Sequence, residues 1–301
     1  MKDNSGDSCR ICNSNTREVI SLGNSPPANN FIESAHEVIK EYPLDVLFCD
    51  ECKGLQLKDC LDEEDLYGNY TYMTPNTKSQ VDHYNNLINF LKNKSIVNLS
   101  TKCLELGSNT GLFLQTIKPY VKSVLGVDPA RNIAEISMAA GIDTIVDFFN
   151  PSSAQKIKEN QGLHDLIIAR HMFAHNKDPK KMLKGIDKIL ADKGFLVIEN
   201  AYAIPTLENG ELDQIYHEHM FYYCVNSMSK LLDLFSLELI SLFNANIHGG
   251  SLAFIVARKG TREAEPIVQK YLNHEEQLFL EDKIFNSFNL NSMAMKDKIL
   301  K

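Results

Sequence analysis

The middle of the chain alternates short apolar runs with segments whose apolar residues recur at helical spacing. Segments 76–91 and 130–140 are the clearest expected helices. Five apolar runs have the length and composition of buried strands, at residues 102–106, 123–128, 143–149, 165–170 and 194–200. Strands that alternate with helices in this way predict a parallel, doubly wound sheet.

Two further apolar runs, at residues 237–243 and 251–258, are separated by a short link that contains Gly249 and Gly250. Such a link predicts an antiparallel hairpin, here at the edge of the sheet. With the five alternating strands, the hairpin completes a seven-stranded α/β sheet of the class I S-adenosylmethionine (SAM) methyltransferase type. A Rossmann-like domain that binds another ligand is the alternative.

The first strand of this sheet runs directly into a glycine turn from Gly107 to Gly111. Glycines let the backbone approach a ligand, and the helix that follows favours a carboxylate or phosphate at its N-terminus. The pattern is GxNxG and not GxGxxG, so a dinucleotide is not specified. Asp128 comes about twenty residues later, where an acid can accept both hydroxyls of a ribose. Asp147 and Phe148 end the third expected strand, where they could contact an adenine.

Four cysteines form two CxxC pairs near the N-terminus, Cys9 with Cys12 and Cys49 with Cys52. Each pair can place two thiolates on one tight turn, and two turns complete a tetrahedral site for a structural zinc ion. A redox CxxC would be single and would lie in a βαβ unit, which this region lacks. The three remaining cysteines look like isolated thiols.

The segment 214–223 combines two histidines, one glutamate and three tyrosines in ten residues. These side chains can move or hold a proton near neutral pH, so we expect the chemistry here. The triplet of His217, Glu218 and His219 is not the HExxH pattern of zinc proteases. A structural cluster, in which each histidine bonds to the backbone, is the alternative. The aromatic segment 67–75 either packs between domains or lines a pocket.

Composition narrows the class of protein further. The 301 residues are 44% hydrophobic and 23% charged, which is typical of soluble globular proteins. The net charge of −8 and the lack of any basic block argue against nucleic acid or an anionic membrane as partner. The sequence shows no apolar run of about 18 residues and no signal peptide, so we expect a cytoplasmic protein.

Taken in order, these motifs resemble the sugar C-methyltransferases that act on nucleotide-linked 4-keto-deoxysugars in bacterial deoxysugar pathways. The matching segments are 9–12, 25–29, 49–52, 55–57, 105–109, 126–130, 169–171, 174–175, 215–219 and 248–252. The resemblance implies SAM as cofactor, a structural zinc ion, and a nucleotide sugar as the small-molecule substrate. In that family the YHEH segment supplies the acid–base residues of the active site, and four cysteines hold the zinc.

A carbon next to a ketone can be methylated once its proton is removed and the enolate is stabilised. His219 is the expected base, and Glu218 is expected to orient a histidine or hold a sugar hydroxyl. Tyr216, Tyr222 or a tyrosine of the 70–72 loop would donate a hydrogen bond to the enolate oxygen. The expected catalytic set is His219, Glu218, Tyr216, His217, Tyr222 and Tyr72. The expected cofactor-binding set is Glu105, Gly107, Asn109, Gly111, Asp128, Asp147, Phe148, Arg170 and His171. No catalytic metal is required.

The sequence departs from this family at two places. The family usually continues into a further C-terminal α/β domain, whereas residues 261–301 predict only a polar helical tail, as in a truncated member. Thr110 stands where an aspartate is common. We therefore expect a zinc-binding unit at 1–75, a methyltransferase domain at 76–260 and the helical tail. An O-methyltransferase and a non-catalytic SAM-binding scaffold remain the rival functions, and the sequence specifies no oligomeric state.

Overall fold

The computed structural model describes residues 8–28, 34, 36, 40–62, 66 and 72–299 of the chain. Residues 32–40, for which the sequence predicts a helix, lie largely outside the described part. Asn29, Tyr67 and Tyr70, which belong to segments singled out in the sequence, also lie outside them. No helix of the described part is both long and apolar enough to cross a membrane.

The larger of two sheets has seven strands in the order β10-β11-β8-β7-β4-β5-β6. The strands β4 to β8 pair in parallel, whereas β11 pairs antiparallel with both β8 and β10. The strand bounds are β4 Lys102–Leu106, β5 Ser123–Val127, β6 Thr144–Ile145, β7 His164–Arg170, β8 Leu190–Ala201, β10 Leu237–Ala245 and β11 Ser251–Arg258. The predicted methyltransferase-type sheet and its terminal hairpin are confirmed.

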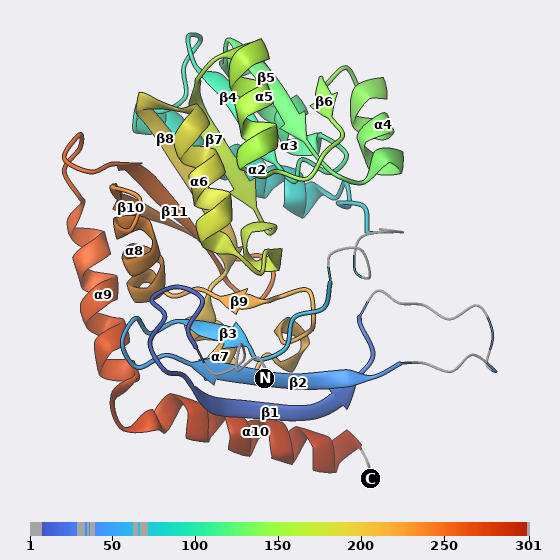
Figure 1. Cartoon of the computed structure of the whole chain (residues 1–301), viewed down its shortest axis with the longest axis vertical. Coiled ribbons are helices and arrows are strands. Elements are labelled where there is room, and N and C mark those ends of the chain that lie inside the picture. The colour runs from blue at the N-terminus through green and yellow to red at the C-terminus, as the bar shows by residue number, and fades with distance from the viewer. Residues whose placement is uncertain are drawn as a thin grey trace.

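Helices cover both faces of this sheet (Figure 1). Neighbouring residues of one strand serve opposite faces: Ile168 packs in the core under α2 and α3, whereas Ile167 packs in the core under α5, α6 and α8. Side chains buried on both faces explain the almost continuous apolar runs in the sequence. The helix bounds are α2 Lys78–Asn93, α3 Leu112–Ile117, α4 Arg131–Ala139, α5 Pro151–Gln161, α6 Pro179–Ile189, α7 Ala203–Asn209, α8 Val225–Asp233, α9 Pro266–Leu278 and α10 Lys283–Ile299.

One expected strand is much shorter than the sequence suggested. The run 143–149 was expected to be a strand throughout, but β6 contains only Thr144 and Ile145. It is an edge strand, and its partners in β5 are Gly126 and Val127 alone. Beyond Ile145 the chain leaves the sheet, and Asp147 and Phe148 reach the cavity described below.

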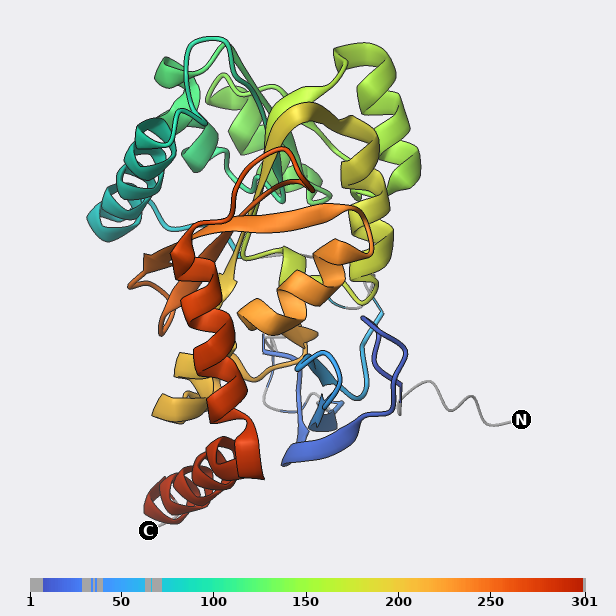
Figure 2. The same ribbon diagram turned by 90° about the vertical axis from the view of Figure 1, so that its left-hand side faces the viewer.

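The smaller sheet has four antiparallel strands in the order β1-β2-β3-β9. Three strands come from the N-terminal part: β1 Arg17–Ser25, β2 Tyr42–Phe48 and β3 Leu55–Leu57. The fourth, β9 Phe221–Tyr222, comes from much later in the sequence. The C-terminal helices α9 and α10 are joined by a short 3-10 turn, and α10 lies along this sheet (Figures 1 and 2). Phe48 contacts Phe279 and Phe285, with ring centroids 5.0 and 4.9 Å away. The smaller sheet is therefore held by segments from both ends of the sequence.

Candidate functional site

A cavity of about 960 Å³ opens at the carboxyl ends of the parallel strands. Ligands of open α/β sheets bind at this edge, because the loops that follow the strands meet there. Residues of both sheets line the cavity: the ends of β4, β5 and β7 on one side, and Ser25, Pro26 and Tyr72 from the N-terminal part on another. The segment 213–219 contributes a third wall.

The glycine turn after β4 is shaped by close packing beneath it. Gly107, Asn109 and Gly111 all have left-handed φ values, of 65°, 48° and 71°. A Cβ on Gly107 would lie 2.9 Å from the side chain of Met172, and one on Gly111 would lie 2.4 Å from the hydroxyl of Ser137. Side chains at either glycine would therefore force the turn away from the strand. Gly107 and Asn109 line the cavity, whereas Gly111 lies behind it.

Asp128 faces the cavity at the end of β5 and is almost fully buried. Its Oδ2 accepts from the backbone N–H of Asn109 at 2.8 Å, and its Oδ1 accepts from that of Ala130 at 3.0 Å. Each carboxylate oxygen has a second lone pair that can accept from a ligand hydroxyl. Burial raises the pKa of this carboxyl, an effect that the two backbone donors oppose. Asp147 and Phe148 line the same end of the cavity.

Arg170 also lines the cavity, and its guanidinium is anchored by Glu105. Its Nε and a terminal nitrogen both donate to Oε1 of Glu105, at 3.0 and 2.8 Å. The guanidinium lies over the rings of Tyr84 and Phe113, 4.3 and 4.4 Å from their centroids. Glu105 itself is fully buried beneath the turn and does not line the cavity. Its expected role in cofactor binding can therefore only be indirect, through Arg170.

Tyr216 and His219 form a hydrogen-bonded pair in the cavity wall. The Nδ1 of His219 lies 2.8 Å from the carbonyl oxygen of Gln214, which can only accept, so Nδ1 carries the proton. The Nε2 is then the acceptor for the Tyr216 hydroxyl, at 2.8 Å. Burial lowers the pKa of His219 to about 4, so the imidazole is neutral at neutral pH. Glu218 lines the cavity beside this pair and is 2% exposed.

Two of the expected catalytic residues lie outside the cavity. His217 is buried, and its Nε2 donates to the carbonyl oxygen of Tyr42 at 3.3 Å. The structural alternative, a histidine bonded to the backbone, thus describes His217. Tyr222 is buried within β9, where burial raises the pKa of its hydroxyl. Tyr72 does line the cavity, and burial raises its pKa too.

Three further histidines surround the cavity, and only His171 was assigned a role from the sequence. The ring of His175 lies 5.2 Å from that of His219, and the rings of His171 and His248 lie 4.6 Å apart. Burial lowers the pKa of all three, that of His171 to about 3. With His219, these residues place four neutral imidazoles in the cavity wall. His175 and His248 lie in segments 174–175 and 248–252, which resemble the sugar C-methyltransferases. That resemblance was the sequence signal that could have assigned them to the site.

A buried charge lies at the end of β8. Glu199 is fully buried, and its Oε1 lies 2.7 Å from Nε2 of His83 in α2. Although burial raises the pKa of this carboxyl, the close contact with His83 outweighs that effect and brings the pKa down to about 2. No sequence signal singled out Glu199, because it is one polar residue within a buried apolar run.

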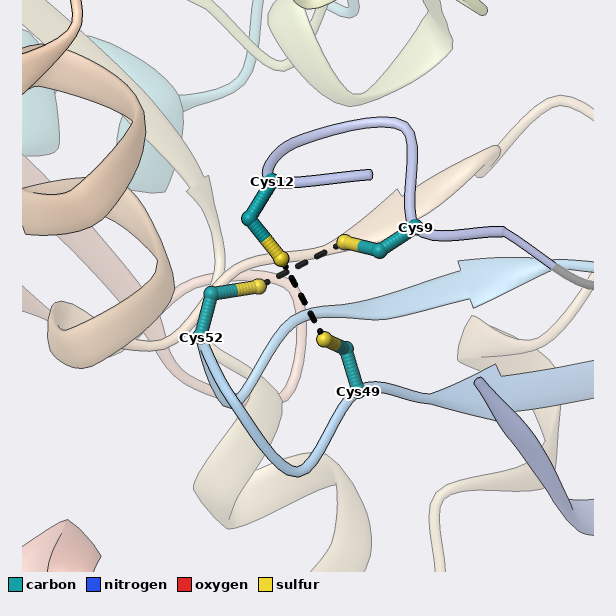
Figure 3. Close-up of side chains that lie close together, drawn as sticks. All are labelled: Cys9, Cys12, Cys49 and Cys52. Carbon is teal, nitrogen blue, oxygen red and sulfur yellow. Dashed lines mark hydrogen bonds between the residues drawn. The ribbon is translucent and has the colours of Figure 1, made fainter. Parts of the chain in front are cut away.

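The four cysteines converge beside the turn that joins β2 to β3 (Figure 3). Their sulfur atoms all lie within 4.8 Å of one another. Cys9 and Cys52 are 3.4 Å apart, as are Cys12 and Cys49. Four thiolates around a zinc ion at about 2.3 Å require separations of this order. The hydrogen bond from Cys52 lowers the pKa of Cys9 to about 5, whereas burial raises the pKa of Cys49 to about 11 and the hydrogen bond with Cys9 raises that of Cys52. Without a metal the site therefore favours a single thiolate.

The two cysteine turns have the same backbone construction. The N–H of Asn13 donates to the carbonyl of Cys9, and the N–H of Lys53 donates to that of Cys49, both at 2.8 Å. Asn13 and Lys53 both adopt left-handed conformations. The repeated geometry and the four-sulfur donor set fit a structural zinc ion, with no position left for a substrate.

A family model described as "Methyltransferase domain" matches residues 75–242, and one described as "Putative zinc binding domain" matches residues 9–67. C-methyltransferase NovU of Streptomyces niveus is 30% identical over 273 residues, which are 89% of this chain and 65% of NovU. YcgJ of Bacillus subtilis, an uncharacterized methyltransferase, is 22% identical over 34% of this chain and 41% of its own length. The chain thus spans less than two thirds of each of these relatives.

Among solved structures, a SAM-dependent methyltransferase of Anabaena variabilis superposes with a TM-score of 0.47 and 12% identity, over 67% of this chain and all of that one. Magnesium protoporphyrin IX methyltransferase of Synechocystis, with bound SAH, gives a TM-score of 0.47 and 11% identity, over 60% of this chain and 84% of that one. The family assignment rests on the sequence match, which covers more than half of the chain. The chain therefore belongs to the methyltransferase-domain family and carries a zinc-binding domain before it.

Proposed function

We propose that this protein is a SAM-dependent methyltransferase that methylates a carbon next to the keto group of a nucleotide-linked deoxysugar. The observation that carries the proposal is that the glycine-turn edge of the sheet and the Tyr216–His219 pair face one cavity. The similarity to NovU, a C-methyltransferase by name, supports transfer to carbon.

The residues at the sheet edge fit SAM. Gly107 and Asn109 would hold its methionine end, Asp128 would accept from its ribose hydroxyls, and Asp147 and Phe148 would contact its adenine. Arg170 and His171 complete this side of the cavity. When bound, SAM supplies an electrophilic methyl group. The volume of 960 Å³ lies at the upper end of the about 300–1,000 Å³ typical of ligand cavities, as expected if a cofactor and a substrate share the site.

His219 would take the proton from the substrate carbon. Its Nδ1–H is fixed on the Gln214 carbonyl, which directs the basic Nε2 toward the Tyr216 hydroxyl and the cavity. The Tyr216 hydroxyl would turn from Nε2 to the substrate oxygen, which frees the lone pair of Nε2. The C–H bond then breaks, its electron pair stays on the substrate as an enolate, and the proton moves to Nε2. The low pKa of His219 keeps the base unprotonated before reaction.

Tyr72 and Tyr216 are the candidates to donate a hydrogen bond to the enolate oxygen, because both line the cavity. The raised pKa of Tyr72 keeps its hydroxyl protonated and able to donate. Glu218 would accept from a sugar hydroxyl. Among the residues expected from the sequence, Tyr222 and His217 are left with supporting roles, since neither lines the cavity.

The test is incubation with methyl-labelled SAM and a panel of nucleotide-linked 4-keto-deoxysugars, followed by mass spectrometry and NMR of the product. We expect one methyl group per sugar, bonded to carbon. A methyl group bonded to oxygen would favour the rival O-methyltransferase. If no member of the panel is methylated although SAM binds, the non-catalytic scaffold becomes the better explanation.

A further inference from the structure

Arg10 lies inside the first cysteine turn, between Cys9 and Cys12, but its side chain leaves that turn. One terminal nitrogen of its guanidinium donates to the carbonyl oxygen of Leu57 at 2.9 Å, and the other donates to that of Met220 at 2.8 Å. The guanidinium carbon lies 4.6 Å from the ring centroid of Phe221. Arg10 therefore joins a cysteine turn to β3 and to the start of β9.

The backbone of Arg10 is fixed as well. Its N–H donates to Oε1 of Gln56 at 2.9 Å, and Nε2 of the same glutamine donates to the carbonyl of Ser8 at 3.0 Å. Gln56 is 1% exposed and belongs to β3. Because both the main chain and the guanidinium are held, the side chain has little freedom to move independently of the cysteine turn.

Met220 directly follows His219. The hydrogen bond from Arg10 to Met220 therefore holds the end of segment 214–219, to which we assign the catalytic residues. The carbonyl of Met220 also accepts from the N–H of Leu57 at 3.1 Å, and its N–H donates to the carbonyl of Ala174 at 2.9 Å. Ala174 precedes His175, whose ring faces His219. A shift of Met220 would thus move His219 relative to both Tyr216 and His175.

We propose that Arg10 is a positioning residue that holds the segment of Tyr216 and His219 in its working geometry. The four-cysteine site fixes the turn that carries Arg10, and through Arg10 it sets the position of the Tyr216–His219 pair in the cavity. The inference rests on the proposed function for the importance of that pair, but the position of His219 can be measured without any substrate.

The main variant is Arg10→Met, which keeps a long side chain but removes both donors. Arg10→Lys keeps the charge and one donor group, so its His219 signals and kcat should lie between those of Arg10→Met and the wild type. Arg17→Met is the matched control, because Arg17 bonds to Asp50 in the second cysteine turn and to Asp282, so this variant loses a contact of the same unit without touching Met220. Each variant is checked for bound zinc and for SAM affinity by calorimetry.

The substrate-free readout is the ¹⁵N NMR spectrum of histidine-labelled protein, with His219 assigned by comparison with His219→Asn. In the wild type, His219 should show a protonated Nδ1 and a bare Nε2. In Arg10→Met we expect these signals to move toward an average of the two tautomers, with bound zinc and SAM affinity unchanged. With an active substrate, kcat should fall by about 10²-fold, the usual cost of misplacing a catalytic group by about 1 Å. Arg17→Met should show neither change.

Unchanged His219 signals in a zinc-loaded Arg10→Met protein would overturn the proposal, as would equal shifts in Arg10→Met and Arg17→Met. If Arg10→Met loses zinc or fails to fold, the comparison is made with the zinc-loaded Arg10→Lys protein. His219 signals and a kcat in that protein equal to those of the wild type would count against the proposal. Shifted signals in a protein whose wild type methylates nothing would leave Arg10 as the positioning residue and refute the proposed function alone.

Discussion

Glu275 in α9 offers the sharpest stability test in the molecule. It is fully buried, and its two oxygens accept four hydrogen bonds. Oε1 accepts from the Tyr202 hydroxyl at 2.7 Å and from the Val225 N–H at 2.6 Å. Oε2 accepts from the backbone N–H and the Nδ2 of Asn226, at 2.8 and 2.9 Å. This carboxylate therefore ties α9 to the first turn of α8.

In Glu275→Gln one of the two acceptors becomes an NH₂ group. With the NH₂ at the Oε2 position, both donors of Asn226 face a donor. With it at the Oε1 position, the Val225 N–H faces a donor, and the Tyr202 hydroxyl must turn to accept. Hydrogen bonds to a charged group contribute about 1.5–3 kcal/mol each. Asn226 Nδ2 retains its bond to the carbonyl of Leu272 at 3.2 Å, which reduces the loss. We expect the free energy of unfolding to fall by about 2–5 kcal/mol.

Urea unfolding followed by far-UV circular dichroism would measure this change. The control is Glu276→Gln, the neighbouring residue of α9, which is exposed. A surface substitution of this kind should change the free energy of unfolding by less than about 0.5 kcal/mol. If the two variants unfold at the same urea concentration, the four contacts of Glu275 contribute nothing net and our reasoning about them is wrong.

The remaining predictions concern the metal, the cofactor, the base and acid stability. Cys49→Ser should lose zinc and unfold or aggregate the N-terminal part, because a closed site contributes folding free energy; metal analysis that finds no zinc in the unchelated wild type would contradict the site. Asp128→Ala should weaken SAM binding by roughly 1–3 kcal/mol, and unchanged affinity in calorimetry would place the ribose elsewhere. His219→Asn should lower turnover by about 10²–10⁴-fold at near-normal SAM affinity; it should also stop solvent-deuterium exchange at the substrate carbon in the presence of demethylated SAM, and equally fast exchange would exclude His219 as the base. Acidification from pH 6.5 to about 4 should destabilise the fold, because burial holds the pKa of His219 at about 4 and that of His171 at about 3, below the ordinary 6.5. The unfolded imidazoles take up protons first, so this stability is present above pH 6.5 and is lost below it; His219→Asn should flatten the slope of unfolding free energy against pH, and an unchanged slope would contradict the buried neutral state.

The sheet could be predicted because each buried strand carries its own signal. Runs such as 165–170 are apolar on both faces, and the glycine turn follows a strand directly. The four-cysteine site was equally visible, since its ligands come in two local pairs. In both cases the signal lies within a few neighbouring residues: an apolar run for each strand, and a CxxC spacing for each cysteine pair.

Within segment 214–219, to which we assign the catalytic residues, local sequence was a poorer guide. Tyr216, Glu218 and His219 line the cavity, whereas His217 turns away to bond with Tyr42. The segment is neither helix nor strand, so no fixed periodicity says which side chains share a face. Glu199 and Arg10 escaped notice for a related reason, because their partners lie far away in the sequence and only the folded chain brings them together.

The pairing of β9 with β3 also bears on the order in which the chain can assemble. During synthesis from the N-terminus, β3 emerges long before residues 221–222, so its edge stays open while most of the larger sheet is being made. An open strand edge can pair with other chains, and contacts between distant segments form late. A fragment of residues 1–75 made alone would keep that edge exposed, and we expect it to associate with itself unless β9 is supplied as a peptide.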